Sequence, residues 1–89
     1  MLEVVYSSRF KRDLRQCAKR QLDLTRLQTV IDTLRTPAAL PAQNRDHDLT
    51  GNYSGFRECH VSPDWLLIYR VDGNALLLAR TGSHSDLFS

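Results

Sequence analysis

One stretch near the middle of the chain, GFRECHVSPDWLLIYR at residues 55–70, constrains the fold most strongly. It predicts two β-strands at residues 56–61 and 65–71, joined by a turn at Ser62-Pro63-Asp64. Proline and aspartate favour turns, and proline cannot donate a hydrogen bond inside a sheet. The second strand is apolar at nearly every position, which is typical of a strand covered on both faces. The stretch therefore predicts a β-hairpin whose second strand is buried.

The flanking segments predict two helices and two further strands. Residues 2–6 form a short β-prone run, and the turn Asp72-Gly73-Asn74 precedes a third hairpin strand at residues 75–81. Apolar side chains recur with helical spacing in two segments, at Phe10, Leu14, Cys17 and Ala18 and then at Leu24, Leu27, Val30, Ile31 and Leu34.

Caps and breakers set the limits of both predicted helices. Ser7 or Ser8 caps the first helix, Asp23 caps the second, and Pro37 ends it. The order is β-α-α-β-β-β, which predicts an α+β fold with two N-terminal helices packed on one face of a small antiparallel sheet.

Length and composition indicate one soluble domain spanning residues 1–89. Apolar residues make up 42% and charged residues 25% of the chain, as in ordinary globular proteins. No apolar run approaches the roughly 20 residues of a membrane helix, and the N-terminus does not resemble a secretory signal. We therefore expect a cytoplasmic protein without a membrane partner, in which Cys17 and Cys59 are reduced, buried apolar residues.

Positive charge is concentrated in the first predicted helix, although the formal net charge is only +2. Six basic residues lie between positions 9 and 20, against Asp13 alone. Such a helix suits a polyanion or an acidic protein partner, and the alternative is an ordinary solvated face. The six residues are Arg9, Lys11, Arg12, Arg15, Lys19 and Arg20.

The three histidines all lie outside the predicted helices. His47 is in the long connection at residues 36–52, His60 is near the end of a strand, and His84 is in the C-terminal tail. An imidazole can accept or donate a proton near pH 7. Two imidazoles on either side of a phosphodiester could take the proton of a ribose 2′-hydroxyl and protonate the leaving 5′-oxygen. Asp64 could orient one ring or act as a base itself.

Four other side chains could assist such a reaction. Arg57 or Arg80 could stabilise the negative charge of a phosphorane, and Trp65 and Phe88 could stack on unpaired bases. Each of them is also compatible with an ordinary role: the arginines as solvated or ion-paired strand residues, and Trp65 as part of the core.

A zinc site is the alternative use of three histidines and an aspartate. The chain has no closely spaced histidine pair of the kind that holds zinc, so we expect neither a metal nor a cofactor.

Several of these segments together resemble the RelE/YafQ superfamily of bacterial toxins, and its YafQ branch in particular. The matching pieces are DHDL at residues 46–49, Gly51, GFR at 55–57, CHV at 59–61, PDWLLIY at 63–69, RTGSH at 80–84 and the Leu-Phe pair at 87–88. The resemblance covers almost the whole chain and is densest from residue 47 onward. Other RelE-like toxins use lysines and arginines where this branch uses histidines, and this chain has no lysine beyond position 19.

The resemblance implies a RelE-like fold and the toxin component of a type II toxin-antitoxin system. It implies ribosome-dependent, metal-independent cleavage of messenger RNA in the decoding site, and neutralisation by a cognate antitoxin in a heterocomplex. It assigns catalysis to His47, His60, Asp64 and His84 as a group, with Trp65 and Phe88 beside them. We expect His84 to donate the proton to the 5′-oxygen, and His47 and His60 to share the base role and the stabilisation of the transition state, a division that the sequence does not fix. The alternatives are a non-catalytic toxin of the gyrase-inhibitor kind on the same fold and an inactive homologue that only binds an antitoxin.

Overall fold

The two helices form where the sequence carries apolar stripes, and both begin at the predicted caps. The computed structural model describes residues 1–89. Helix α1 (Ser8–Lys19) follows Ser7, whose hydroxyl accepts a hydrogen bond from the Phe10 amide at 2.9 Å. Helix α2 (Leu24–Arg35) follows Asp23, whose carboxylate accepts one from the Thr25 amide at 3.0 Å.

The strands form one five-stranded sheet in the order β1-β5-β4-β3-β2. The two hairpins lie where the sequence predicts them. Strand β3 pairs antiparallel with β4, and β4 pairs antiparallel with β5, in each case across a short turn. The elements are β1 (Glu3–Tyr6), β2 (His47–Asp48), β3 (Arg57–Ser62), β4 (Trp65–Asp72), β5 (Ala75–Gly82), the 3-10 turns η1 (Ala42–Asn44) and η2 (Gly51–Tyr53), and the short helix α3 (His84–Phe88).

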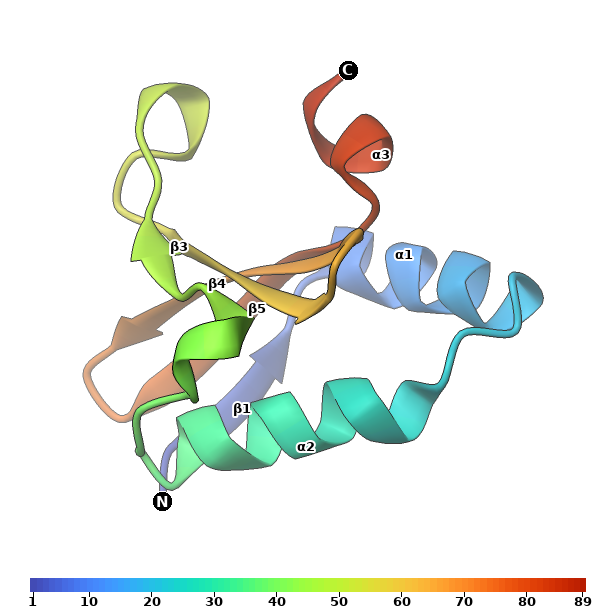
Figure 1. Ribbon diagram of the computed structural model, residues 1–89. Coiled ribbons are helices and arrows are strands. Elements are labelled where there is room, and N and C mark those ends of the chain that lie inside the picture. The colour runs from blue at the N-terminus through green and yellow to red at the C-terminus, as the bar shows by residue number, and fades with distance from the viewer.

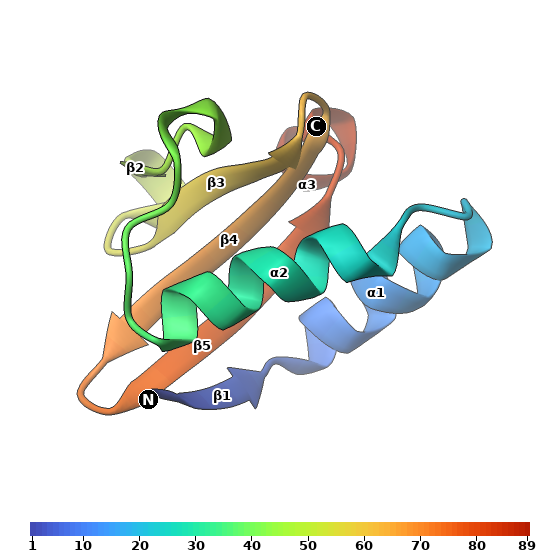
Figure 2. The ribbon, with the colours of Figure 1, turned by 60° about the horizontal axis from the view of Figure 1, so that its bottom comes forward.

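The two faces of the sheet are covered unequally. Helices α1 and α2 lie against one face, as Figures 1 and 2 show. On the opposite face, the loop that contains η2 and the C-terminal helix α3 rise at the two sides of the sheet (Figure 1). We call these the helix face and the histidine face.

The main core lies between the helices and the sheet. Alternate residues of β4, Trp65, Leu67 and Tyr69, point into this core, while Leu66 and Ile68 point to the histidine face and pack against Leu87 of α3. Both sets are buried, which confirms that β4 is covered on both faces.

Both cysteines are free and buried, as expected. Cys59 lies in the main core, where burial raises the pKa of its thiol to about 12. Burial also raises the pKa of Cys17. Both thiols are therefore protonated at neutral pH and poor nucleophiles.

The α+β class and the helix-on-sheet arrangement agree with the prediction, but the sheet is mixed rather than wholly antiparallel. Strand β1 pairs in parallel with β5, with Glu3 opposite Ala75. The sequence did not predict β2, which is only two residues long, or that the tail forms α3. No helix has both the length and the apolar character needed to cross a membrane.

Candidate active site

A buried carboxylate lies between two of the three histidines on the histidine face. His47 on β2 is directly opposite Glu58 on β3, and His60 follows two residues later on the same side of β3. The Glu58 carboxylate is 3.5 Å from His47 Nε2 and 3.8 Å from His60 Nε2, and its side chain is only 8% exposed. The two imidazoles thus share one carboxylate.

The other nitrogen of each ring meets a backbone carbonyl. His47 Nδ1 lies 2.6 Å from the Arg45 oxygen, and His60 Nδ1 lies 3.3 Å from the Pro63 oxygen. A carbonyl and a carboxylate both only accept, so a doubly protonated ring would find an acceptor at each nitrogen. In a neutral ring that keeps its proton on Nδ1, the lone pair of Nε2 is the proton acceptor.

The third histidine begins α3, next to the β3–β4 turn. The Asp64 carboxylate accepts a hydrogen bond from the backbone amide of His84 at 3.3 Å. The sequence suggested that Asp64 could orient an imidazole ring; in the structure it holds the backbone of His84 instead. His47 and His60 thus lie on either side of Glu58, and the β3–β4 turn links this group to the backbone of His84.

Polar contacts hold α3 in place. Ser83 and Asp86 form a capping box, in which each side chain bonds the backbone amide of the other residue. Arg20 of α1 donates two hydrogen bonds to the Asp86 carboxylate, at 2.6 and 3.1 Å. This pairing holds the pKa of Asp86 well below its usual range. The position of His84 thus depends on α1 as well as on its own helix.

An aromatic pair accompanies His84. The Phe88 ring lies 5.0 Å from the His84 ring and 5.8 Å from the Tyr53 ring, measured between centroids. Phe88 is 41% exposed, so one part of it is free to contact a ligand. Beside it is a cavity of about 590 Å³, which is also lined by Arg9 and Arg80. Phe88 is therefore accessible to a base, and its stacking role stays a prediction.

Trp65 is not accessible to a base. It is 3% exposed and lies in the main core, and its indole nitrogen donates a hydrogen bond to the Thr81 hydroxyl at 2.9 Å. The prediction that Trp65 stacks on a base is wrong for this conformation, because the alternation along β4 turns the ring toward the helices.

The two predicted strand cations are also already paired. Arg57 lies opposite Tyr69, on the helix face, and donates hydrogen bonds to Asp46 at 3.2 Å and Asp48 at 2.6 Å. Arg80 donates two hydrogen bonds to Asp13 of α1, at 2.7 and 3.2 Å. Neither is a free cation, so the expectation that they contact RNA phosphates is not supported.

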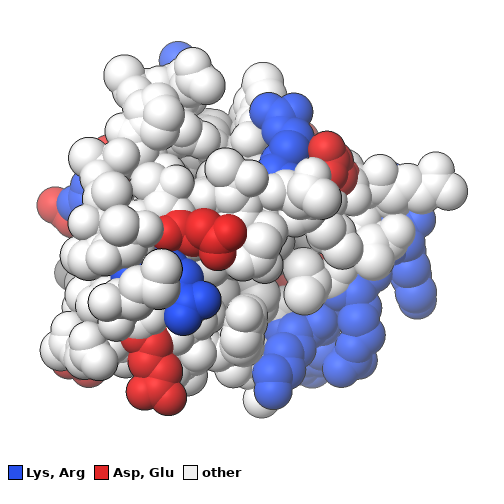
Figure 3. Space-filling model, turned by 90° about the horizontal axis from the view of Figure 1, so that it is seen from below, with Lys and Arg blue, Asp and Glu red and all other residues white.

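The basic residues in α1 and at its C-cap form an exposed surface without histidines, and Arg9 of this surface also lines the cavity beside Phe88. All six are exposed, and Arg20 alone among them forms an ion pair, with Asp86. Figure 3 shows Lys and Arg side chains gathered at the lower right, over α1. This basic surface consists of Arg9, Lys11, Arg12, Arg15, Lys19 and Arg20.

Glu58 is the site residue that sequence reasoning missed. The signal was present, because a residue two positions before His60 in a strand shares its face. An acidic side chain at that position, next to a histidine, could have been read as its partner. What the sequence did not indicate is that His47, eleven residues earlier, lies on the other side of the same carboxylate.

No three or more His, Cys, Asp or Glu side chains come together in a way that could hold a metal ion. The site instead offers three imidazoles, one buried carboxylate and an exposed aromatic ring on one face. Such a set is suited to proton transfer next to a bound nucleotide.

Comparisons with known proteins show similarity over nearly the whole chain. A family model described as the YafQ bacterial toxin of type II toxin-antitoxin systems matches residues 2–89. The mRNA interferase toxin YafQ of Escherichia coli (strain K12) is 37% identical over 87 residues, covering 97% of this chain and 95% of that protein.

Solved structures of similar proteins have the same fold. A metal-bound toxin from Helicobacter pylori has a TM-score of 0.92 at 42% identity, covering 99% of this chain and 100% of that one. A chain of the E. coli DinJ-YafQ toxin-antitoxin complex has a TM-score of 0.90 at 36% identity, covering 99% of this chain and 98% of that one. The match over nearly the whole length, in both sequence and structure, shows that this chain belongs to the YafQ family of type II toxin-antitoxin toxins.

Proposed function

We propose that this protein is an endoribonuclease toxin that cleaves messenger RNA in the decoding site of the ribosome. The observation that carries the proposal is that His47 and His60 flank the buried Glu58 carboxylate, while Asp64 of the adjacent β3–β4 turn binds the backbone of His84. The E. coli relative named mRNA interferase supports the same activity. A non-catalytic toxin would not need three imidazoles on one face.

The reaction is an attack of the ribose 2′-hydroxyl on its own 3′-phosphate. His60 and His47 share the role of the base and the stabilisation of the phosphorane. His60 Nε2 makes no close hydrogen bond at 3.8 Å from Glu58, so it can accept the 2′-hydroxyl proton, and the carboxylate stabilises the imidazolium that forms. The bond from phosphorus to the 5′-oxygen breaks, and His84 donates the proton to that oxygen.

Phe88 stacks on a base and so positions the strand for this step. Asp64 acts through the backbone of His84, which it holds at the start of α3. The basic surface contacts ribosomal RNA phosphates, a cognate antitoxin, or both in turn. The antitoxin proposal is supported by the DinJ-YafQ complex of the E. coli relative.

The test is to map cleavage of a messenger RNA with purified protein, with and without ribosomes. We expect cuts only with ribosomes present and none for a His60→Ala/His84→Ala double variant. Glu58→Gln removes the charge but keeps the shape, and it should slow cleavage. Undiminished cutting by the double variant would overturn the mechanism.

Metal independence needs its own measurement, because a similar toxin has been solved with a bound metal. We expect the cleavage rate to be unchanged after the protein is treated with EDTA and assayed in Mg²⁺, which the ribosome needs. A rate that falls on this treatment and returns only with a transition metal would contradict the proposal.

A further inference from the structure

The outer edge of β3 carries a polar cavity with two arginines that the reaction above does not use. Strand β2 pairs only with Arg57 and Glu58, so β3 has no strand neighbour from His60 onward. Helix α2 and the η1 turn flank this open edge instead. The cavity measures about 410 Å³, which is within the range of about 300–1,000 Å³ typical of ligand sites. Its polar lining is Arg26, Gln43, Asn44, Arg45, His60 and Ser62.

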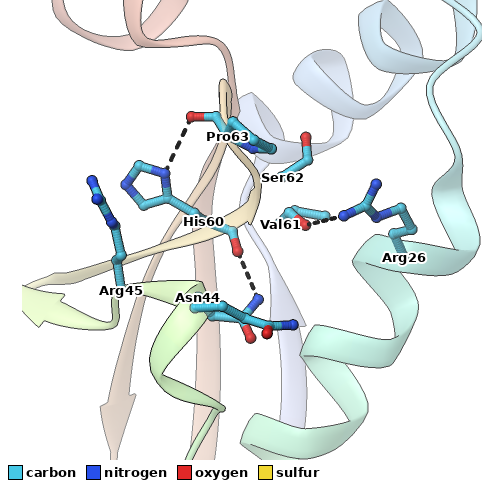
Figure 4. A pocket seen from close by; sticks show the side chains of 8 residues that line it. Arg26, Asn44, Arg45, His60, Val61, Ser62 and Pro63 are labelled. Carbon is cyan, nitrogen blue, oxygen red and sulfur yellow. Dashed lines mark hydrogen bonds between the residues drawn. The ribbon is translucent and has the colours of Figure 1, made fainter.

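Hydrogen bonds fix the walls of this cavity. The Asn44 side-chain amide donates to the His60 carbonyl at 2.7 Å, and the Arg26 guanidinium donates to the Val61 carbonyl at 3.3 Å. Arg45 has a left-handed backbone with φ of 49°, and its carbonyl accepts the hydrogen bond from His47. Figure 4 shows Arg45 and Arg26 on opposite sides of the strand edge, with His60 and Val61 between them.

The charged residues that line the cavity are all positive. Two guanidinium groups line it, together with amides, a hydroxyl and an imidazole, and no carboxylate is among the lining residues. Neither Arg26 nor Arg45 forms an ion pair, whereas Arg20, Arg57 and Arg80 are all matched with aspartates. Arginines in a cavity without acids are well suited to bind phosphate, because the guanidinium fork matches its oxygens.

We propose that this cavity binds the RNA backbone at a phosphate next to the one that is cleaved. The inference rests on the proposed function and deepens it. His60 belongs to both places: its Nε2 faces Glu58 in the reaction site, and the residue also lines the cavity. A strand whose scissile phosphate lies at His60 therefore passes next to the β3 edge. Arg26 and Arg45 then hold the flanking phosphate and set the direction of the strand.

An acidic protein segment is the competing ligand for two arginines. The cavity favours RNA, because Val61 and Pro63 are the only lining residues with wholly apolar side chains, whereas a bound protein segment usually also buries apolar anchors. RNA backbone binding needs little more than cations and polar donors.

Binding of a short RNA tests the proposal without relying on cleavage. The probe is a fluorescent eight-nucleotide 2′-O-methyl oligoribonucleotide, which lacks the attacking hydroxyl, with binding followed by anisotropy at several salt concentrations. We compare the wild-type protein with an Arg26→Gln/Arg45→Gln variant. Arg26→Gln and Arg35→Gln form a second, charge-matched pair, because Arg35 lies at the opposite end of α2 and outside the cavity.

We expect the double variant to bind about tenfold more weakly and Arg26→Gln to bind more weakly than Arg35→Gln. The slope of log K against log salt should become shallower by about 0.7 for each phosphate that the variant no longer neutralises. Replacing single phosphates with neutral methylphosphonates should then identify one position that weakens binding to the wild type but not to the double variant. Thermal melts of all variants check that they remain folded.

Equal RNA binding by wild type and double variant, with both folded, would overturn the proposal. So would a double variant that keeps RNA binding but loses binding to a hexaglutamate peptide, since that result assigns the cavity to an acidic protein segment. Failure of the proposed function is a separate outcome: absence of message cleavage by the wild type would refute the nuclease and leave the binding result intact.

Discussion

The two faces of the sheet are built on different principles. The helix face buries a continuous core of fourteen residues under α1 and α2. The only apolar residues buried on the histidine face are Leu66, Ile68 and Leu87, with a few half-buried neighbours. Burial of apolar surface is the main source of stability, so the helix face stabilises the fold. The thinly covered face can leave imidazoles and an aromatic ring accessible to a ligand.

The histidine face compensates for its small core with polar ties. Helix α3 has only one buried residue, Leu87, and is otherwise held by the Ser83–Asp86 capping box, the Arg20–Asp86 pair and the hydrogen bond from His84 to Asp64. A five-residue helix has little intrinsic stability. Substitutions on this face should therefore change activity more than stability, and substitutions on the helix face should do the reverse.

The largest expected effect is the loss of cleavage activity when a histidine of the histidine face is replaced. Replacing His60 or His84 with alanine should lower the message cleavage rate by about 10²–10⁴-fold, because each removes a proton-transfer group. The melting temperature should remain close to that of the wild type, since both rings lie outside the main core. Ribosome-dependent cleavage kinetics and thermal melts make the measurement. A variant that loses activity only because it unfolds would not support the comparison.

The next effect is the loss of stability when a buried leucine is replaced, which should be larger on the helix face than on the histidine face. Leu67→Ala, at a fully buried position on the helix face, should destabilise the protein by about 2–5 kcal/mol. Leu87→Ala should lie at the lower end of that range, because its small cluster can relax, yet it should reduce cleavage by loosening α3. Urea unfolding and cleavage assays on both variants test this. Equal losses of stability would mean that the histidine face is not the weaker one.

A smaller effect concerns the polar tie of α3. Asp86→Ala removes a capping contact, which costs about 1 kcal/mol and should lower the melting temperature by about 4–8 °C. Cleavage should fall as well, because His84 is then less well held. Asp72→Ala, at an exposed carboxylate in the β4–β5 hairpin, is the matched control and should have little effect on either.

The Arg20–Asp86 ion pair predicts that the stability of the fold depends on pH, with a definite sign. Pairing with Arg20 lowers the pKa of Asp86 in the folded protein, so the charged carboxylate stabilises the fold above its unfolded pKa of about 3.9. That contribution is lost as the pH falls below about 4. The difference in melting temperature between wild type and Asp86→Ala should therefore shrink between pH 5 and pH 2. A difference that stays constant over this range would show that the charge of Asp86 contributes nothing.

The smallest effect tests the reassignment of Trp65. Trp65→Phe keeps an aromatic ring in the core but removes the hydrogen bond to Thr81, which should cost about 1 kcal/mol. Cleavage by the folded fraction should be unchanged, because the ring does not reach the histidine face. Cleavage kinetics at a temperature well below the melting transition measure this. A large loss of activity without a loss of stability would restore Trp65 to the site.

The sequence predicted much of the fold because most of its signals are local. Helix caps at Ser7 and Asp23, the apolar stripes and the hairpin turns depend on residues within a few positions of each other. The partner of β1 could not be predicted this way, because Glu3 pairs with Ala75, some seventy residues later. Residue types and the family resemblance singled out His47, His60, Asp64, His84 and Phe88, and the structure brings these residues to one face.

The sequence by itself determined which chemical groups are available and which segments carry them. Only the tertiary structure decided which of these groups are exposed and which are buried or paired with an opposite charge. In a strand as uniformly apolar as β4, the pattern does not say which face is which, so the burial of Trp65 followed from the packing of the helices. Arg57 and Arg80 are neutralised by aspartates on other elements, and Glu58 gains two histidine neighbours through the pairing of β2 with β3. Charge compensation depends on distances in space, and the order of residues along the chain does not contain those distances.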